Sequence, residues 1–314
     1  MTASILDTGT ETRALVAGPA SRRRSRAPQA ADAPPPSIAP GPMARTFGII
    51  ALVVAMLYFL VPVYWLVVAS TKSNADLTST FGFWFADWNL ADNYDKLMSW
   101  TQGLFWQWVG NSVLYSTAAG VIGTLFAVMA GYAIAKFVFP GKRIAVGVIM
   151  AGLLLPVALL TIPLYVEFHA LGLTNTVWAI IIPSAVSPFG VFLGMVYAQS
   201  SVPTELLEAA RIDGAGEIRI FFTIVIRLLA PAMVTIFLFV FVATWNNFLL
   251  PLMMVSSPEL KPVTLGLYGM MSYFAPQKGA VMLGALLGVI PLIVLFFTLQ
   301  RYWRSGLAAG AVKG

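Results

Sequence analysis

The sequence predicts an all-α integral membrane protein with six transmembrane helices. Hydrophobic residues make up 59% of the 314 residues, and the mean hydropathy is +0.82, which is more than a water-soluble domain normally carries. Six long runs contain no Asp, Glu, Lys, Arg or His. Each run reaches the roughly 20 residues that a helix needs to cross about 30 Å of hydrocarbon.

The uncharged runs are expected to be helices and not barrel strands. Unpaired backbone amides cost several kcal/mol in lipid, and a helix satisfies its own. The runs also lack the strict alternation of lipid-facing and lumen-facing residues that a barrel strand shows. The expected spans are residues 46–69, 112–135, 144–166, 176–198, 228–254 and 279–299.

Residues 1–45 are expected to form a disordered N-terminal tail. An arginine cluster, SRRRSR at 21–26, precedes a stretch rich in Pro and Ala at 27–42, and such a composition buries too little apolar surface to fold alone. An export signal is the alternative. The first apolar run is too long for a cleaved signal core, so we expect an uncleaved anchor and a tail attracted to anionic lipid.

The basic residues indicate the orientation of the chain. With the N-terminus inside, 15 of the 19 Lys and Arg residues are cytoplasmic, which is the usual bias of membrane proteins. Both termini are therefore expected in the cytoplasm, the C-terminal one as a tail at 307–314. The connection 199–227 is then cytoplasmic. The connection 70–111 is external and rich in aromatic residues, so it is either an interfacial belt with a small cap or a docking surface for an external partner.

Motifs that carry chemistry are missing. Without cysteine there are no disulfides, thiolate metal sites or cysteine nucleophiles. No phosphate-binding G-x-x-x-x-G-K-[ST] segment occurs, so the chain is not expected to hydrolyse ATP. Gly214 and Gly216 begin a G-x-G, but Arg219 stands at the third glycine position. His169 is expected to be a solvated interface residue. We predict no catalytic residue, no metal site and no nucleic-acid partner.

The spans contain small residues and amides instead of charges. The absence of ionisable residues in them weakens a secondary-transporter function. Asn246 and Asn247, which follow Trp245, are the most polar pair, and because adjacent side chains point in different directions, at most one should line a pathway. The G-x-x-x-G segments 190–194 and 284–288 allow close helix approach, either within the chain or at a subunit interface.

The cytoplasmic stretch EAARIDGAGEIRIFF, residues 208–222, is unusually charged for this chain. Glu208 lies in a predicted helix, Asp213-Gly214 is a turn signal, and a second helix is expected from about Ala215. A hairpin that caps the bundle would explain the charges. The cluster of small residues favours a helix that fits closely into a groove on another protein.

This stretch resembles the EAA loop of permease subunits from binding-protein-dependent ABC importers. The resemblance extends from about residue 48 to residue 306 and is closest to the smaller permease subunit of the maltose type. Two positions depart from the pattern: Arg227 stands where a proline is common, which is expected to straighten the start of the fifth span, and Gly216 stands where a serine is common. The matching residues are Glu208, Ala209, Ala210, Asp213, Gly214, Ala215, Phe221, Ile224 and Pro231, with the flanking segments NSVLYST, GYAIAKFVFPGKR, IPLY, LGLTNT and TWNNFLLPL.

The resemblance implies a type I importer permease fold over residues 46–306 and a function in moving a sugar or oligosaccharide across the bacterial cytoplasmic membrane. It implies two copies of an ATPase subunit that carry ATP and Mg, a second permease (a heterodimer is favoured) and an extracytoplasmic solute-binding protein. The chain itself would be non-catalytic and hold no cofactor. An importer of amino acids or peptides and an ATP-independent carrier remain alternatives.

The resemblance also assigns roles within the loop. Glu208 would be the charged partner of the ATPase, Ala209 and Ala210 would form the close-packed face, and Gly214 would supply the bend. Asp213 and Ala215 would complete the contact. The candidates for the pathway or for a helix interface are Trp245, Asn246 and Asn247.

Overall fold

The structure is a computed structural model that describes residues 41–271 and 277–311. These residues form helices and contain no strand, which confirms the all-α prediction. The chain divides into two units, Met1–Leu57 and Tyr58–Gly314, each considered by itself. Residues 1–40 of the expected tail lie outside the described part, whereas residues 42–45 already belong to helix α1 (Pro42–Ser70).

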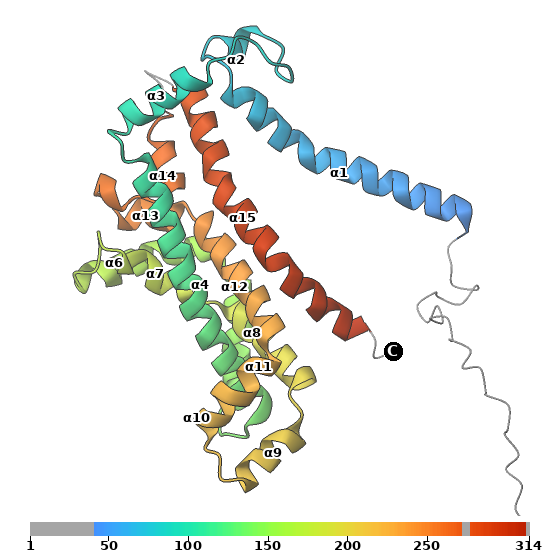
Figure 1. The fold of residues 1–314 in the computed structure, drawn as a ribbon. Coiled ribbons are helices and arrows are strands. Elements are labelled where there is room, and N and C mark those ends of the chain that lie inside the picture. Colours follow the sequence, from blue (N-terminus) through green and yellow to red (C-terminus); the bar gives the residue numbers. More distant parts are fainter. Residues whose placement is uncertain (1–40, 272–276, 312–314) are drawn as a thin grey trace, which may run out of the picture. The chain divides into compact units, whose positions relative to one another are not determined.

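The elements after α1 all belong to the second unit (Figure 1). In chain order they are α2 (Asp76–Ser79), α3 (Leu90–Trp100), α4 (Phe105–Lys136), α5 (Lys142–Leu154), η1 (Val157–Leu160), α6 (Thr161–Ala170), α7 (Trp178–Ala185), α8 (Pro188–Ser201), α9 (Thr204–Ile212), α10 (Glu217–Ile220), the π-helical turn η2 (Phe221–Val225), α11 (Ile226–Leu228), α12 (Ala230–Trp245), α13 (Leu249–Met254), η3 (Pro258–Leu260), α14 (Val263–Tyr268) and α15 (Lys278–Ala311).

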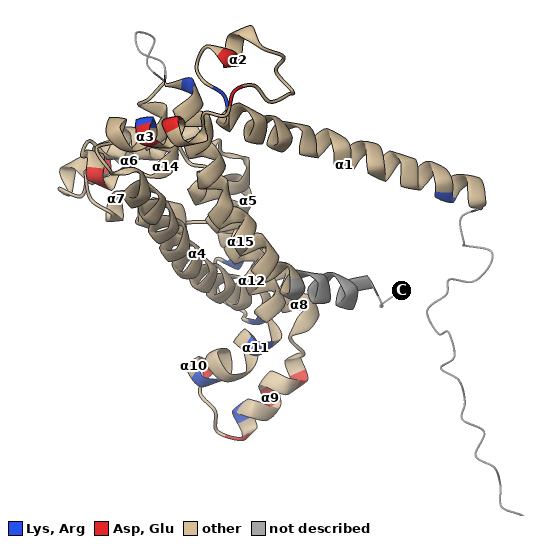
Figure 2. Cartoon of the chain, turned by 45° about the horizontal axis from the view of Figure 1, so that its top comes forward, with Lys and Arg blue, Asp and Glu red and all other residues tan. Residues whose placement is uncertain are grey.

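Four helical segments are long and apolar enough to cross a membrane: α1, α4, α7 together with α8, and α15 as far as Gln300. Two bent helix pairs qualify as well if each pair is one span, which brings the described chain to the six predicted spans. In the second unit, charged residues lie mainly toward the two ends of the bundle and leave the middle uncharged (Figure 2). A bilayer favours that distribution, because a charge at its centre is costly.

The expected span 144–166 is not one straight helix. The chain bends by 100° between α5 and the segment formed by η1 and α6. Pro156 has no N–H to continue the helix, and it forces the residue before it toward an extended backbone. Leu155 accordingly adopts a ψ of 123°.

The expected span 228–254 is also interrupted. Helix α12 ends at Trp245, and α13 begins only at Leu249. The side-chain oxygen of Asn247 accepts a hydrogen bond from the Leu250 N–H at 3.3 Å, as a residue does when it caps a helix start. The Asn247 side chain therefore supports the start of α13.

Several helix ends differ from the sequence prediction. Helix α4 begins at Phe105 and not at residue 112, and the expected loop 70–111 contains α2 and α3. The positive φ angles of Gln102 (52°) and Gly103 (80°) make the turn between α3 and α4. Residues 307–311, expected to be a tail, continue α15, while residues 312–314 lie outside the described part.

Helix α4 forms the centre of the second unit and packs against α7, α8 and α12. A Cβ on Gly131 would lie 2.5 Å from the backbone nitrogen of Met195 on α8, and a Cβ on Gly194 would lie 3.1 Å from the carbonyl oxygen of Ala127 on α4. The glycines of segment 190–194 therefore serve packing within the chain. In segment 284–288 the glycines likewise face α14.

Candidate functional site

The predicted coupling stretch forms two helices at one end of the second unit, opposite the end that holds α2 and α3 (Figure 1). Pro203 precedes α9 in an extended conformation, and Glu205 lies in the first turn, where a carboxylate favours the positive end of the helix dipole. Helix α10 starts after Gly216, which is extended at φ −71° and ψ 157°. That position is a helix N-cap, for which serine is a preferred residue, so the serine common in the family has a local structural reason.

The turn between α9 and α10 is a Schellman motif. The Ala215 N–H donates to the carbonyl of Ala210 at 2.9 Å, and the Gly214 N–H donates to the carbonyl of Arg211 at 3.0 Å. Gly214 has a φ of +79°, the left-handed conformation that this motif requires at that position and that glycine adopts without strain. The sequence signal Asp213-Gly214 thus marks a defined turn.

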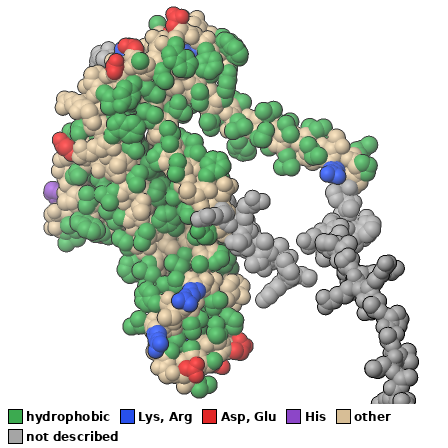
Figure 3. Space-filling model, viewed as in Figure 1, with side chains coloured by type: hydrophobic (Ala, Val, Ile, Leu, Met, Phe, Trp, Pro, Cys, Tyr) green, Lys and Arg blue, Asp and Glu red, His purple; other side chains and the backbone are tan. Residues whose placement is uncertain are grey.

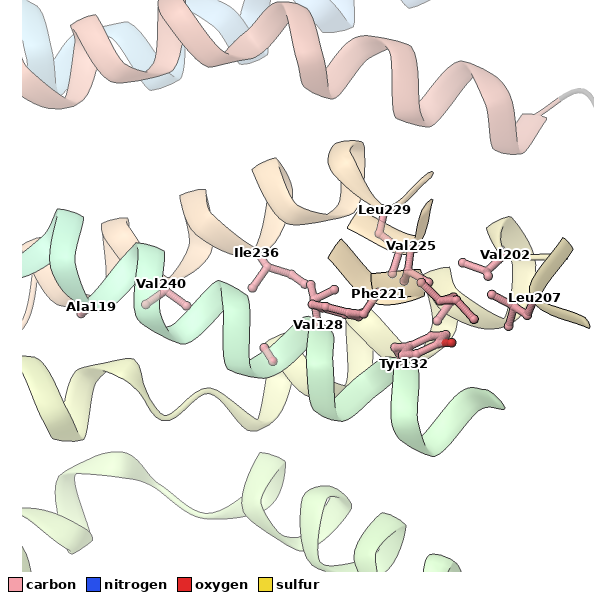
Figure 4. Packing of buried hydrophobic residues seen from close by; sticks show 13 residues of the cluster. Ala119, Val128, Tyr132, Val202, Leu207, Phe221, Val225, Leu229, Ile236 and Val240 are labelled. Atoms are coloured by element: carbon pink, nitrogen blue, oxygen red, sulfur yellow. The ribbon is translucent and has the colours of Figure 1, made fainter. Parts of the chain in front are cut away.

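Buried side chains fix α9 to the bundle (Figure 4). Leu207 is only 1% exposed, although the residues on either side of it are exposed. It belongs to one apolar cluster with residues of α4, of the segment after α10, and of α12. The cluster includes Val128, Tyr132, Val202, Ile220, Phe221, Val225, Leu229, Ile236 and Val240. Leu207 therefore joins α9 to an apolar cluster that extends to α4 and α12.

A charged contact links α9 to α10. The Arg211 Nε donates to a carboxylate oxygen of Glu217 at 2.6 Å, and this hydrogen bond raises the pKa of Arg211 above its usual value. The guanidinium carbon also lies 5.9 Å from the centre of the Phe137 ring, at the end of α4, within range of a cation–π contact. Both charged side chains are more than a third exposed, so the pair holds the hairpin in shape but adds at most about 1 kcal/mol.

The structure divides the predicted contact residues into two groups. Glu208, Ala209, Asp213 and Gly214 are exposed, whereas Ala210 and Ala215 are half-buried and pack against the bundle's own apolar cluster. The close-packed face assigned to the two alanines is therefore split, because one alanine faces outward and the other inward.

Sequence reasoning missed part of this site. Ile218 on α10 is 78% exposed, and Ile212 on α9 is 86% exposed. In the described residues neither packs into a core cluster. Two isoleucines on either side of an Asp-Gly turn were the available signal. Arg211 and Glu217 were likewise missed as a pair, since their spacing of six residues places them together only once the turn is formed.

Arg227 does not straighten the start of α12, so that expectation was wrong. The segment Glu217–Leu228 meets α12 at 81°, and the break falls at Leu229, whose ψ is 4°. Pro231, in the first turn of α12, cannot donate the hydrogen bond that would continue a helix from before the break. This proline is sufficient for a bend without one at position 227.

The pathway candidates Trp245, Asn246 and Asn247 differ in their surroundings. Trp245 is 3% exposed, stacks on Phe241 at 5.8 Å between ring centres, and contributes to the lining of the same cavity as Asn246. Asn246 lines a cavity of about 400 Å³ between α12, α14 and α15, and its amide donates to the Val242 carbonyl at 2.9 Å. Asn247 does not line this cavity but caps α13, as described above. Only one of the two amides therefore faces open space.

The sequence is similar to a family of transport proteins and to individual transport permeases. A family model described as "Binding-protein-dependent transport system inner membrane component" matches residues 123–308. The chain is 36% identical to an arabinooligosaccharides transport system permease protein of Halalkalibacterium halodurans, over 68% of this chain and 76% of that protein. It is 32% identical to a lactose transport system permease protein of Rhizobium radiobacter, over 80% and 90%.

Among solved structures, the fold is similar to a chain from a bacterial ABC transporter involved in the import of the acidic polysaccharide alginate. The TM-score is 0.71 at 23% identity, over 84% of this chain and 99% of that chain. This likeness supports the fold of an importer permease for the described residues.

Proposed function

The chain belongs to the family of binding-protein-dependent transport system inner membrane components, and from this membership we propose that it is the smaller permease subunit of a carbohydrate ABC importer. It lies in the bacterial inner membrane and moves a sugar or oligosaccharide across it. The named relatives transport arabinooligosaccharides and lactose, which supports the carbohydrate class over amino acids or peptides.

The observation that carries the mechanism is the attachment of α9. Its inner face is held in the core by Leu207, while Glu208, Ala209 and the turn at Asp213-Gly214 are exposed. We propose that this exposed face, with Ile212 and Ile218 beside it, lies in a groove of a separate ATPase subunit. A movement of the ATPase then displaces α9 as a rigid lever, and the buried side chains pass the displacement to α4 and α12.

The same proposal assigns the partners. Two ATPase copies bind ATP and Mg, a second and different permease completes the pathway, and an external solute-binding protein delivers the sugar. This chain supplies no catalytic group and no cofactor of its own. Such an importer transports only if ATP and the loaded binding protein each bind one access state more tightly than the other.

We also propose the topology in which both termini are cytoplasmic, since α9 must face the ATPase. The basic segment before α1 would then face the anionic lipid of the inner leaflet. In the pathway, Asn246 faces the translocated sugar from the cavity between α12, α14 and α15. Trp245 contributes to the wall of the same cavity, and Asn247 supports the start of α13.

The experiment that tests the function is uptake by the complete importer in proteoliposomes, with ATP enclosed and labelled arabinooligosaccharides or lactose outside. We expect uptake that requires ATP and the binding protein. Glu208→Lys and Gly214→Asp should abolish uptake and weaken recovery of the ATPase with the permease. Gly216→Asp is the matched control, because it adds the same charge two residues away at a helix N-cap, where aspartate is favoured.

Three results would contradict the proposal. Uptake that persists without ATP would indicate a carrier. Uptake of amino acids or peptides but of no sugar would move the chain to another substrate class. Normal transport and ATPase recovery in both Glu208→Lys and Gly214→Asp would remove α9 from the coupling mechanism.

A further inference from the structure

The connection between α1 and α3 carries an aromatic surface that transport as proposed above does not use. Residues 80–88, here called the aromatic loop, contain five aromatic residues and a single charged one, Asp87. Phe81, Trp84 and Trp88 are 73%, 66% and 69% exposed. Hydrophobic side chains lie among polar and charged ones at the top of the space-filling view (Figure 3).

Two side chains from the α1 end donate hydrogen bonds to backbone carbonyls of the aromatic loop. Lys72 is 1% exposed, and its ammonium group donates to the Phe81 carbonyl at 2.7 Å and to the Thr80 hydroxyl at 2.9 Å. The Tyr64 hydroxyl donates to the Phe83 carbonyl at 2.9 Å. The carbonyls of Phe81 and Phe83 are thus paired inside the protein while the rings of Phe81, Trp84 and Trp88 are exposed, which lowers the cost of placing these two carbonyls where water is scarce.

The contact with Tyr64 also fixes the level of the loop along α1. Tyr64 lies six residues before Ser70, the last residue of α1, which corresponds to about 9 Å along the helix axis. Side chains on a helix lean toward its N-terminus, so the hydroxyl does not reach back toward the helix end. Gly82 lies beside Trp65, since a Cβ there would be 3.9 Å from the indole nitrogen. The loop therefore folds back along a helix that is apolar enough to span a membrane.

A position about 9 Å before the end of α1 is close to the boundary between lipid headgroups and hydrocarbon if the helix ends at the membrane surface. Each headgroup region of a bilayer is about 5–8 Å thick, as the difference between its total and hydrocarbon thickness shows. Tryptophan and tyrosine gather in that region because their rings are apolar and their polar groups can still reach water. Tyr64, Trp65, Trp84 and Trp88 are residues of this type at the end of one span.

We propose that the aromatic loop is a membrane anchor that inserts its rings into the phospholipid interface beside the end of α1. Lipid is favoured over a protein partner because the loop follows a membrane span, carries almost no charge, and has paired backbone acceptors at Phe81 and Phe83. Anchored in this way, the loop would hold the end of α1 at a constant depth.

The absence of cysteine in the chain allows a direct test. Single variants Trp84→Cys and Trp88→Cys, each carrying a nitroxide label, are incorporated with the complete importer into vesicles of phosphatidylcholine and phosphatidylglycerol. The control is Asp95→Cys on α3, which is exposed and replaces a charged residue. We expect the ratio of relaxation by oxygen to relaxation by a water-soluble nickel chelate to be several-fold higher at positions 84 and 88 than at position 95.

A second variant tests the attachment to α1. Tyr64→Phe removes only the donor to the Phe83 carbonyl, and we expect it to increase the mobility of the label at position 84 without changing position 95. Equal nickel access at positions 84, 88 and 95 would overturn the proposal. Protection of positions 84 and 88 only after the solute-binding protein is added would also overturn it, in favour of a protein docking surface. The label reports depth and not uptake, so failure of the transport proposal would remain a separate result.

Discussion

Replacing Gly214 by alanine tests the turn that positions α9. Gly214 has a φ of +79°, and a Cβ added there would meet no atom within 4 Å, so the whole cost is one of backbone conformation. For a residue with a side chain the left-handed region costs about 1–2 kcal/mol. Gly216→Ala is the matched control, because a Cβ is equally free there but φ is −71°. Replacing a glycine at a compatible φ adds about 0.4–1 kcal/mol of stability, and the lower preference of a helix N-cap for alanine than for glycine offsets this gain.

Hydrogen exchange measures this difference at the turn itself. The N–H groups of Asp213 and Ala215 donate to carbonyls of α9 at 3.0 and 2.9 Å, and they exchange only when the turn opens. A cost of about 1–2 kcal/mol corresponds to roughly a 5- to 30-fold change in an equilibrium constant. We expect exchange at these two amides to accelerate by that factor in Gly214→Ala and to stay the same or slow in Gly216→Ala. ATP-driven uptake should fall only in the first variant.

The reasoning fails if the two variants exchange alike. Equal protection in both would mean that the left-handed turn does not hold α9 in place. Accelerated exchange combined with normal uptake would show that the turn is real but that transport does not depend on it.

Three further predictions concern the bundle. Gly131→Ala should reduce the yield of folded protein in detergent, because its Cβ would lie 2.5 Å from a backbone nitrogen of α8, whereas Gly147→Ala should not, since a Cβ there meets no atom within 4 Å. The Tyr132 hydroxyl is buried and has no hydrogen-bond partner in the described part of the chain, so Tyr132→Phe should leave the unfolding midpoint unchanged or raise it, because an unsatisfied buried hydroxyl costs about 1–3 kcal/mol. Asn246→Leu should raise the sugar concentration for half-maximal uptake at unchanged protein yield, whereas Asn247→Leu should lower the yield, since a lost cap costs about 1 kcal/mol.

The spans and the coupling turn were predictable because their signals are local. Runs without charge and a minimum length identify apolar helices, and Asp213-Gly214 supplies both a turn signal and the one residue type that tolerates a positive φ. Both features depend on residues that are adjacent in the chain. The apolar helices and the turn therefore form regardless of how the rest of the chain packs.

What was missed depends on distant residues. The start of α4 was assigned to the external loop, yet the side-chain amides of Gln107 and Asn111 on α4 both donate to the Glu259 carbonyl, at 3.1 and 2.7 Å, from the opposite half of the sequence. Similarly, Ala209 and Ala210 are the same residue type, and only the packing of Leu207 decides which of them faces outward. Pro156 accounts for the break after α5, but a proline alone does not determine the angle of 100°.

Cross-linking in the complete importer tests most directly that the exposed face of α9 meets the ATPase. Because the chain has no cysteine, Ala209→Cys and Ala91→Cys can each carry a photoreactive benzophenone label. Both alanines are exposed, and they lie on α9 and α3, at opposite ends of the second unit (Figure 1). We predict a cross-link to the ATPase subunit from position 209 and none from position 91. No ATPase product from position 209, or equal products from both positions, would contradict the account.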